Sequence, residues 1–150
     1  MRGIFLDSNV VVAIFMRSDP NHLAVEYWLE KEKEGCQFFI SPQVMAETYA
    51  TVTSPTKFQQ PLAPAQARSG LNEFVSANDI KMVVGGEAAL QQALEISVKL
   101  NKRARQFFDL LIWGTMMEHG IKILATFNTR DFLALPAIKL ITPAMEPSQE

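Results

Sequence analysis

Short apolar segments alternate with longer helical stretches along almost the whole chain of 150 residues. The strand-like segments are 3–6, 36–40, 80–84 and 122–127, with a possible fifth at 138–142. The helical stretches between them are 10–16, 18–35, 42–53, 65–78, 87–101 and 109–120. Strands that alternate with helices favour a sheet that is mostly parallel and covered on both faces. We therefore predict an α/β fold with a central sheet of four to five strands flanked by helices on both faces.

Polar residues next to proline mark two of the predicted helix starts. Asp19 and Pro20 predict a capped first turn for the helix within 18–35. Ser41 and Pro42 repeat this pattern directly after the second strand. Both helices are therefore expected to begin at these positions.

The chain is expected to form a single domain over residues 1–150, since no repeat, low-complexity tract or linker interrupts it. Hydrophobic residues make up 48% of the chain, which is enough for a substantial core. Only the last residues, 143–150, read as a flexible tail. No signal-peptide pattern and no membrane-spanning apolar run is found, so we expect a cytoplasmic protein with no membrane partner.

Charge and cysteine content exclude several functional classes. The formal net charge is −2, whereas a general nucleic-acid coat protein is usually basic. An enzyme that holds a phosphodiester through metal ions and a local basic strip remains compatible with this balance. The single cysteine, Cys36, cannot form an internal disulfide, and no paired Cys/His spacing predicts a zinc site.

Asp7 comes directly after the first apolar segment. In parallel sheets, ligands bind beyond the carboxyl ends of the strands, and residues 126–131 follow another strand end. These two segments are far apart in the sequence and can be close in space. The alternative is that Asp7 only shapes a turn or caps the next helix.

Asp109 is the only charged residue within residues 107–114. Helical spacing places it on one face with Ile112, Trp113 and Met116. A carboxylate on an apolar face is costly unless it is paired, hydrogen-bonded or bound to a metal. The alternative is an N-cap at the start of its helix, which alone can explain an aspartate there.

A basic strip precedes Asp109 and can neutralise it or contact a phosphate backbone. Its members are Lys99, Lys102, Arg103 and Arg105. Most charge runs are simply solvated faces, which is the alternative for this strip. Arg103, Arg105 and Arg130 are the residues we predict to contact such a phosphate backbone.

Glu47 has the weakest signal of the acids. The apolar stripe of its helix consists of Val44, Met45, Tyr49 and Val52, and Glu47 points away from it. An exposed glutamate is one interpretation. A position facing a cleft at the sheet edge is the other, because this helix directly follows the second strand.

Three polar residues follow the fourth strand: Thr126, Asn128 and Asp131. Thr126 and Asn128 can simply shape a turn, and Asp131 can cap the short helix over 132–135. Taken together, however, carboxylates at strand ends and helix starts of one parallel sheet can converge on a single pocket. Several carboxylates in one pocket repel one another, so they favour divalent cations such as Mg²⁺ or Mn²⁺, which prefer hard oxygen ligands.

The sequence resembles the PIN-domain ribonucleases, and more narrowly the VapC-like toxins of type II toxin–antitoxin systems. The matching motifs, in order, are "FLDSNV", "SPQVMAETYATVT", "FFDLLIWGTM" and "LATFNTRDF". The resemblance implies a PIN-like domain in which Asp7, Glu47 and Asp109 are catalytic, metal-binding acids. It also implies that Ser8 and Asn9 support the first acid.

The fourth motif departs from the fullest pattern of the family. Many PIN domains carry an acid two residues after the threonine, and here Asn128 occupies that place. Asp131 can substitute for this acid as a further catalytic residue, or Asn128 can hold a metal-bound water.

The resemblance further implies metal-assisted hydrolysis of RNA phosphodiester bonds, with one or two Mg²⁺ or Mn²⁺ ions per site. The products would carry a 5′-phosphate and a 3′-hydroxyl group. It also implies two protein partners, namely a cognate VapB-like antitoxin and a second copy of the chain in a homodimer.

Two other functions compete with this interpretation. A phosphatase with an aspartyl nucleophile on its first strand typically needs a second acid two residues later, where this chain has Asn9. The third possibility is a PIN-like binding module without catalytic activity, against which the presence of all three acids argues.

Overall fold

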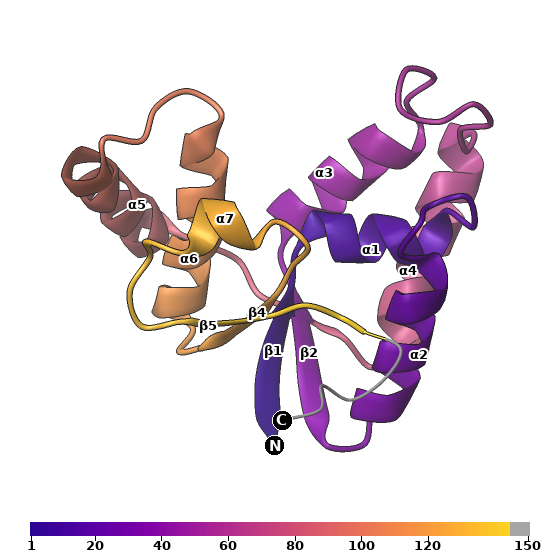
Figure 1. The fold of residues 1–150 in the computed structure, drawn as a ribbon, viewed down its shortest axis with the longest axis horizontal. Helices are drawn as coiled ribbons and strands as arrows, with labels where there is room; N and C mark the ends of the chain where they lie inside the picture. Colours follow the sequence, from indigo (N-terminus) through magenta and orange to yellow (C-terminus); the bar gives the residue numbers. More distant parts are fainter. Residues whose placement is uncertain (145–150) are drawn as a thin grey trace.

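The computed structural model describes residues 1–144 (Figure 1). The strands are β1 (Arg2–Leu6), β2 (Cys36–Ile40), β3 (Lys81–Met82), β4 (Ile123–Ala125) and β5 (Lys139–Ile141). The helices are α1 (Ser8–Phe15), α2 (His22–Glu32), α3 (Pro42–Val52), α4 (Pro64–Ala77), α5 (Glu87–Leu100), α6 (Gln106–Glu118) and α7 (Thr129–Phe132). Of the predicted tail, residues 145–150 lie outside the described residues.

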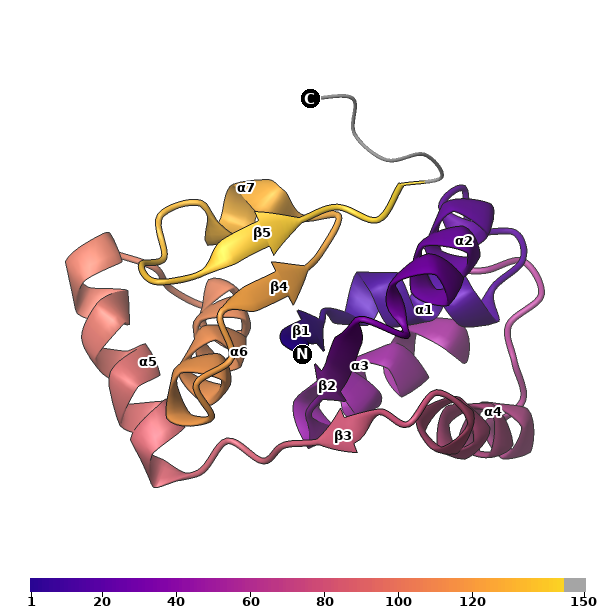
Figure 2. The same ribbon diagram turned by 90° about the horizontal axis from the view of Figure 1, so that it is seen from below.

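All five strands form one parallel sheet in the order β3-β2-β1-β4-β5. Helices α1 to α4 cover one face and α5 and α6 cover the other, as Figure 2 shows. The predicted α/β fold with a mostly parallel sheet and helices on both faces is therefore confirmed. The strand order reverses between β1 and β4, so the chain leaves these neighbouring strands in opposite directions. Such a switch point is where open parallel sheets usually bind ligands.

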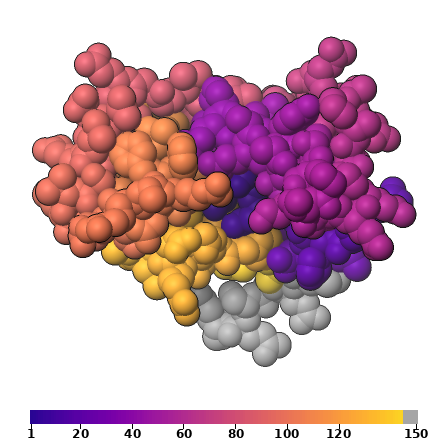
Figure 3. Space-filling view, turned by 90° about the horizontal axis from the view of Figure 1, so that it is seen from above, coloured from indigo at the N-terminus to yellow at the C-terminus, as the bar shows by residue number. Residues whose placement is uncertain are grey.

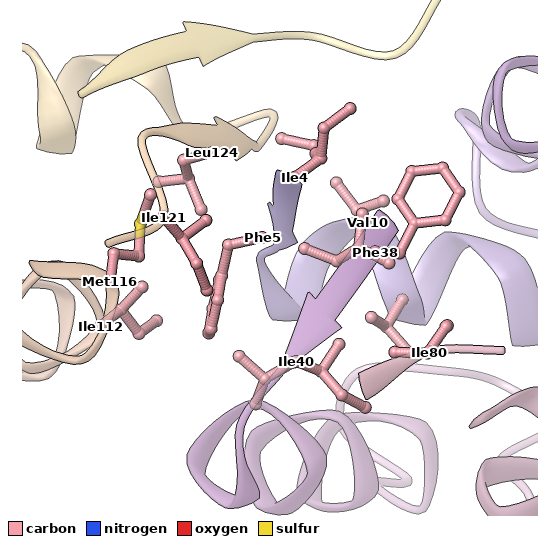
Figure 4. Packing of buried hydrophobic residues seen from close by; sticks show 14 of the residues in the cluster. Ile4, Phe5, Val10, Phe38, Ile40, Ile80, Ile112, Met116, Ile121 and Leu124 are labelled. Atoms are coloured by element: carbon pink, nitrogen blue, oxygen red, sulfur yellow. The ribbon is translucent and has the colours of Figure 1, made fainter. Parts of the chain in front are cut away.

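The centre of the sheet is buried on both faces. Ile4, Phe5 and Leu6 of β1 are 0% exposed, which explains why this strand reads as a continuous apolar run. Figure 4 shows Phe5 directed toward Met116 of α6, while Val10 of α1 lies on the opposite side of the strand. Full burial of one such side chain stabilises the fold by about 1.5–3 kcal/mol.

Close packing of α5 against α6 fixes the position of the second helix. A Cβ atom on Gly114 of α6 would lie 2.4 Å from the carbonyl oxygen of Ala89 on α5, so only glycine fits there. The first turn of α6, which carries Asp109, is thereby held at a fixed place beside the sheet.

One predicted helix start is correct and one is wrong. Ser41 caps α3 as predicted, with its Oγ accepting a hydrogen bond from the Val44 backbone N–H over 3.3 Å. α2 begins at His22 rather than at Pro20. Asp19 instead accepts a hydrogen bond from the backbone N–H of Asn21 over 2.8 Å, which forms a turn before the helix.

The third strand is shorter than its apolar sequence suggests. Of residues 80–84, only Lys81 and Met82 pair with β2. In the part of the chain that the structure describes, no helix combines the length and the apolar composition needed to cross a membrane.

Candidate active site

Asp7 lies at the switch point, directly after β1. Its backbone N–H donates to the carbonyl oxygen of Ala125 over 3.0 Å, which continues the pairing of β1 with β4. Its side chain is also the N-cap of α1, because Oδ1 accepts a hydrogen bond from the Ser8 backbone N–H over 2.8 Å. The capping role does not exclude a functional role, since the cap uses only Oδ1 of the carboxylate.

Thr126 and Asn9 hold the second oxygen of Asp7. The hydroxyl of Thr126, a fully buried residue after β4, donates to Oδ2 of Asp7 over 2.7 Å. The amide of Asn9 donates to the Thr126 hydroxyl over 3.3 Å, and its Oδ1 accepts from the Phe127 backbone N–H over 3.2 Å. These hydrogen bonds thus connect the ends of β1 and β4 around the carboxylate of Asp7.

Burial raises the pKa of Asp7 from 3.8 to about 6. The side chain is only 5% exposed, and removal from water disfavours its charged form. The hydrogen bonds from Thr126 and Ser8 lower this pKa, whereas the negative charges of Glu47 and Asp131 raise it further. A buried acid with a shifted pKa at a switch point is a strong candidate for a functional group.

Asp109 lies in the first turn of α6, which begins at Gln106. The N-cap position is occupied by Arg105, so the interpretation of Asp109 as an N-cap is wrong. Its partly buried carboxylate lies on the helix face that carries the buried side chains of Ile112 and Trp113.

Burial is again the largest cause that raises the pKa of Asp109, here from 3.8 to about 7. The negative charges of Asp7, Asp131 and Glu47 raise it further, in that order, and Lys102 lowers it without cancelling the increase. Local neutralisation by the basic strip therefore does not account for Asp109. The four acids share one electrostatic environment, although they come from four different segments.

Gln43 connects the two helices that carry Glu47 and Asp109. Its Nε2 donates to Oε1 of Glu47 over 3.0 Å and to the carbonyl oxygen of Phe108 over 2.9 Å. Glu47 is half-buried, which agrees with a position facing a cleft. The sequence interpretation missed Gln43, and the available signal was its spacing of four residues from Glu47 on one helix face.

Asn128 and Asp131 lie together at α7. The Asn128 amide donates to Oδ2 of Asp131, and the Asn128 backbone N–H donates to the Thr126 hydroxyl over 3.0 Å. Asp131 is the third residue of α7, so it does not cap a helix over 132–135 as one interpretation had it. The negative charge of Asp131 raises the pKa of both Asp7 and Asp109, so Asp131 belongs to the same electrostatic environment.

The space-filling view shows where these residues open to the surface (Figure 3). The surface is hollowed between the purple residues around α3 and the orange residues near the start of α6, with indigo N-terminal residues at the bottom. Arg103, Arg105 and Arg130 are exposed, and Arg103 donates to Oδ1 of Asn101 over 3.0 Å. Within residues 1–144, these arginines form no ion pair with the acids.

The donor set has the right chemistry for a hard divalent cation. It consists of the oxygens of carboxylate groups. Burial and neighbouring negative charges raise the pKa of two of these groups, Asp7 and Asp109. Among residues 1–144, no three His, Cys, Asp or Glu side chains lie close enough together to bind one ion as a group. The residues thus fit such an ion in charge and ligand type, but they do not form a closed three-ligand cluster.

Comparison with known proteins supports one family. The family model for the PIN domain matches residues 4–137, which include all four acids. Comparison with curated protein sequences gives no match.

Several solved structures share the fold at low sequence identity. VapBC2 from Rickettsia felis, bound to a DNA fragment from its promoter, has a TM-score of 0.70 at 20% identity, and the alignment covers 93% of this chain and 98% of that chain. VapC20 of Mycobacterium tuberculosis, a toxin that cleaves the sarcin-ricin loop, has a TM-score of 0.67 at 18% identity, covering 88% and 95%. The DNA-bound VapBC of Salmonella typhimurium has a TM-score of 0.67 at 18% identity, covering 95% and 98%.

Proposed function

The chain belongs to the PIN domain family, and we propose that it is a divalent-metal-dependent endoribonuclease, the toxin of a VapBC-type pair. The observation that carries this proposal is the convergence of Asp7 and Asp109 on one site, where the negative charge of Asp7 adds to burial in raising the pKa of Asp109. Neither a turn nor an N-cap explains both acids.

Asp7, Glu47 and Asp109 would hold one or two Mg²⁺ or Mn²⁺ ions. When bound, such ions activate water and stabilise the charge that develops on the phosphodiester. Asp131, which accepts a hydrogen bond from the Asn128 amide, would serve as the fourth acid. Proton release is expected on metal binding, since carboxylates with raised pKa values must be ionised to act as ligands.

The remaining polar residues orient these acids. Thr126, the Ser8 backbone N–H and Asn9 fix the direction of the Asp7 carboxylate, and Gln43 does the same for Glu47. Such outer partners typically change metal affinity or activity by about 10- to 100-fold. We further propose that Arg103, Arg105 and Arg130 contact RNA phosphates, because all three are exposed near the ends of α6 and α7.

A VapB-like antitoxin is the proposed protein partner. The structures from Rickettsia felis and Salmonella typhimurium are VapBC complexes, which supports this proposal for the present chain. A cytoplasmic location follows from the same proposal and stays a prediction.

A homodimer is also proposed, through the outer face of α5. Leu90, Leu94 and Val98 follow one another at four-residue spacing and are 40%, 45% and 81% exposed. Apolar side chains aligned in this way are typical of a contact surface. Light scattering at micromolar concentration should show a dimer, and Leu94→Glu should shift it toward the monomer; a monomeric wild type would contradict the proposal.

Incubation of the purified chain with single-stranded RNA tests the main proposal. Cleavage is expected with Mg²⁺ or Mn²⁺, should stop with excess EDTA, and should leave 5′-phosphate ends. Release of phosphate from p-nitrophenyl phosphate instead would favour the phosphatase, although Asn9 donates its amide to Thr126 and supplies no acid. If the chain cleaves neither the RNA nor the phosphate ester, the result would favour the inactive binding module.

A further inference from the structure

A second hollow lies directly beside the acidic site. It has a volume of about 580 Å³ and is formed by the start of α1, the turn before α2 and the loop between α3 and α4. Its polar and aromatic lining includes Asn9, Asp19, Thr51, Lys57, Phe58 and Gln59. We propose that this hollow is a nucleotide subsite, in which the base adjacent to the cleaved bond stacks on Phe58. The inference rests on the proposed ribonuclease function and adds a base-reading site to it.

The hollow and the acidic site share two residues. Ser8 and Asn9 line the hollow, and both donate hydrogen bonds to Asp7, through the Ser8 backbone N–H over 2.8 Å and the Asn9 amide over 3.5 Å. A phosphate held near Asp7 therefore has the hollow as its immediate neighbour. This is where the next nucleotide of a bound strand would lie.

Phe58 is held in a suitable way for stacking. It is partly buried and packs against a small apolar cluster of Val12, Met16, Val52 and Ala67, which fixes one side of the ring. The remaining surface of Phe58 lines the hollow. Aromatic side chains provide stacking surfaces for bases in proteins that bind single strands.

The charges of the lining agree with a base beside Asp19 and a phosphate beside Lys57. Lys57 lines the hollow, is exposed and, in residues 1–144, forms no ion pair, so its ammonium group is available for a phosphate. Asp19 is half-buried in the wall, where a carboxylate repels anions but accepts hydrogen bonds from base N–H groups. An anion bound beside Asp19 would be repelled, whereas a base would not.

The size and shape also suit one nucleotide. A volume of about 580 Å³ is within the range of roughly 300–1,000 Å³ for sites that bind small molecules. Ser18, Pro20 and Gln59 are exposed at its edge, so a strand can continue into solvent on that side. The hollow between α3 and α4 is different: it is lined mainly by apolar residues such as Met45 and Leu71, and none of the acids contributes to it.

Binding of mononucleotides to the metal-free full chain tests the subsite without cleavage. AMP, GMP, CMP and UMP would be titrated while the backbone amide signals are followed by NMR. We expect shifts at residues 8–9, 18–19 and 57–59, and about tenfold weaker binding for Phe58→Leu. Phe58→Tyr, which keeps the aromatic face, should bind like the wild type. Tyr49→Leu, an aromatic residue of the other hollow, is the matched control and should have no effect.

Cleavage of a random-sequence RNA pool provides the functional readout. The wild type should prefer one base at one position next to the cut, and Phe58→Leu should flatten that preference while Phe58→Tyr retains it. If Phe58→Leu does not fold, Asp19→Asn serves instead, because it preserves the turn before α2 and should change which nucleotide binds best.

The outcomes separate the two proposals. Nucleotide binding at these amides without any RNA cleavage would refute the ribonuclease function and support the subsite. RNA cleavage with unchanged base preference and unchanged nucleotide affinity in Phe58→Leu would overturn the subsite and leave the ribonuclease function standing.

Discussion

The acidic site has a strand half and a helix half, and the two are built differently. In the strand half, Asp7 is 5% exposed and accepts hydrogen bonds from Ser8 and Thr126. In the helix half, Glu47 and Asp109 are half-exposed, and Gln43 is the only side chain in residues 1–144 that bonds to either carboxylate. The strand half is fixed by the backbone of the sheet, whereas the helix half depends on how α3 and α6 pack.

The two halves also differ in what balances their charge. For Asp7, hydrogen bonds partly offset the effect of burial on the pKa. For Asp109, burial and three negative neighbours act in the same direction, and only Lys102 opposes them. A bound cation would therefore relieve more unfavourable energy in the helix half, while Asp7 would provide the rigid side of the site.

Replacing Asp109 should have the largest effect. Asp109→Asn keeps the size of the side chain but removes the negative charge, so RNA cleavage should fall by more than about a hundredfold. The metal-free protein should melt at the same or a higher temperature, because repulsion is relieved. The increase in melting temperature caused by Mn²⁺ should shrink, since a ligand stabilises only the state that it binds.

Asp79→Asn is the matched control for this substitution. Asp79 is exposed and has a φ of 51°, a left-handed conformation that asparagine tolerates well. It should cleave RNA and respond to Mn²⁺ like the wild type. An Asp109→Asn variant that cuts RNA at nearly the wild-type rate would remove Asp109 from the metal site and most of the mechanism with it.

The buried strands and two of the acids, Asp7 and Asp109, could be predicted from the sequence. Continuous apolar runs identified the buried parallel strands, and a carboxylate directly after such a run identified Asp7 as a switch-point residue. The lone charge on the apolar face of Ile112 and Trp113 identified Asp109 as a candidate site residue. Each of these signals is local, because it depends on burial of neighbouring residues in the same element.

The remaining features depend on contacts between distant elements. The direction of Glu47 and the bridge formed by Gln43 follow from the approach of α3 to α6, which periodicity within one helix does not describe. The start of α2 was misplaced because Asp19 caps a turn instead of the helix. The hollow next to Phe58 joins three segments, so no single stretch of sequence predicts it.

Thr126→Val should produce the next largest effect and sharpen the contrast. The substitution removes the hydroxyl that donates to the buried Asp7 carboxylate, so the free energy of unfolding should fall by about 1.5–3 kcal/mol. In an Asp7→Asn background the loss should be smaller, because the partner is no longer charged. Urea denaturation of the four proteins measures this coupling, and equal losses in both backgrounds would show that Thr126 acts through packing alone.

Thr53→Val is the control for the loss of a threonine hydroxyl. Its hydroxyl donates to the carbonyl oxygen of Tyr49 over 2.8 Å at an exposed position. The expected change in the free energy of unfolding is within about 0.5 kcal/mol, as for most surface substitutions.

The pH dependence of stability should reveal both halves at once. The folded-state pKa values of Asp7 and Asp109 are raised from 3.8 to about 6 and about 7, so the folded state binds protons more tightly than the unfolded state. The contribution of these acids to stability is complete below about pH 4 and is lost as the pH rises through 6 and 7. The metal-free protein should therefore melt at a higher temperature at pH 5 than at pH 8.

Variants assign this pH effect to the two acids. Asp109→Asn should reduce the difference in melting temperature between pH 5 and pH 8, with the change concentrated near pH 7. Saturating Mn²⁺ should restore stability at pH 8 in the wild type. If Asp109→Asn showed the same difference as the wild type, the ionisation of other groups would be responsible.

The smallest effect is expected for Gln43, and it tests whether the helix half is positioned by a side chain at all. Gln43→Leu removes the bridge between Glu47 and the carbonyl oxygen of Phe108, but it leaves no fully buried polar group without a partner. The free energy of unfolding should thus change by less than about 0.5 kcal/mol. A carboxylate that is free to rotate binds a cation less well. The Mn²⁺ concentration for half-maximal cleavage should therefore rise about threefold to tenfold, which is at or below the lower end of the effects typical for outer partners of metal ligands. The rate at saturating Mn²⁺ should change little, since the bound ion itself would hold Glu47 in place.

Gln91→Leu, at an exposed position of α5, is the control and should leave both the free energy of unfolding and the half-maximal Mn²⁺ concentration unchanged. A lower rate at saturating Mn²⁺ with an unchanged half-maximal concentration would instead mean that Gln43 contacts the RNA, and the helix half would then be positioned by the packing of α3 and α6 alone.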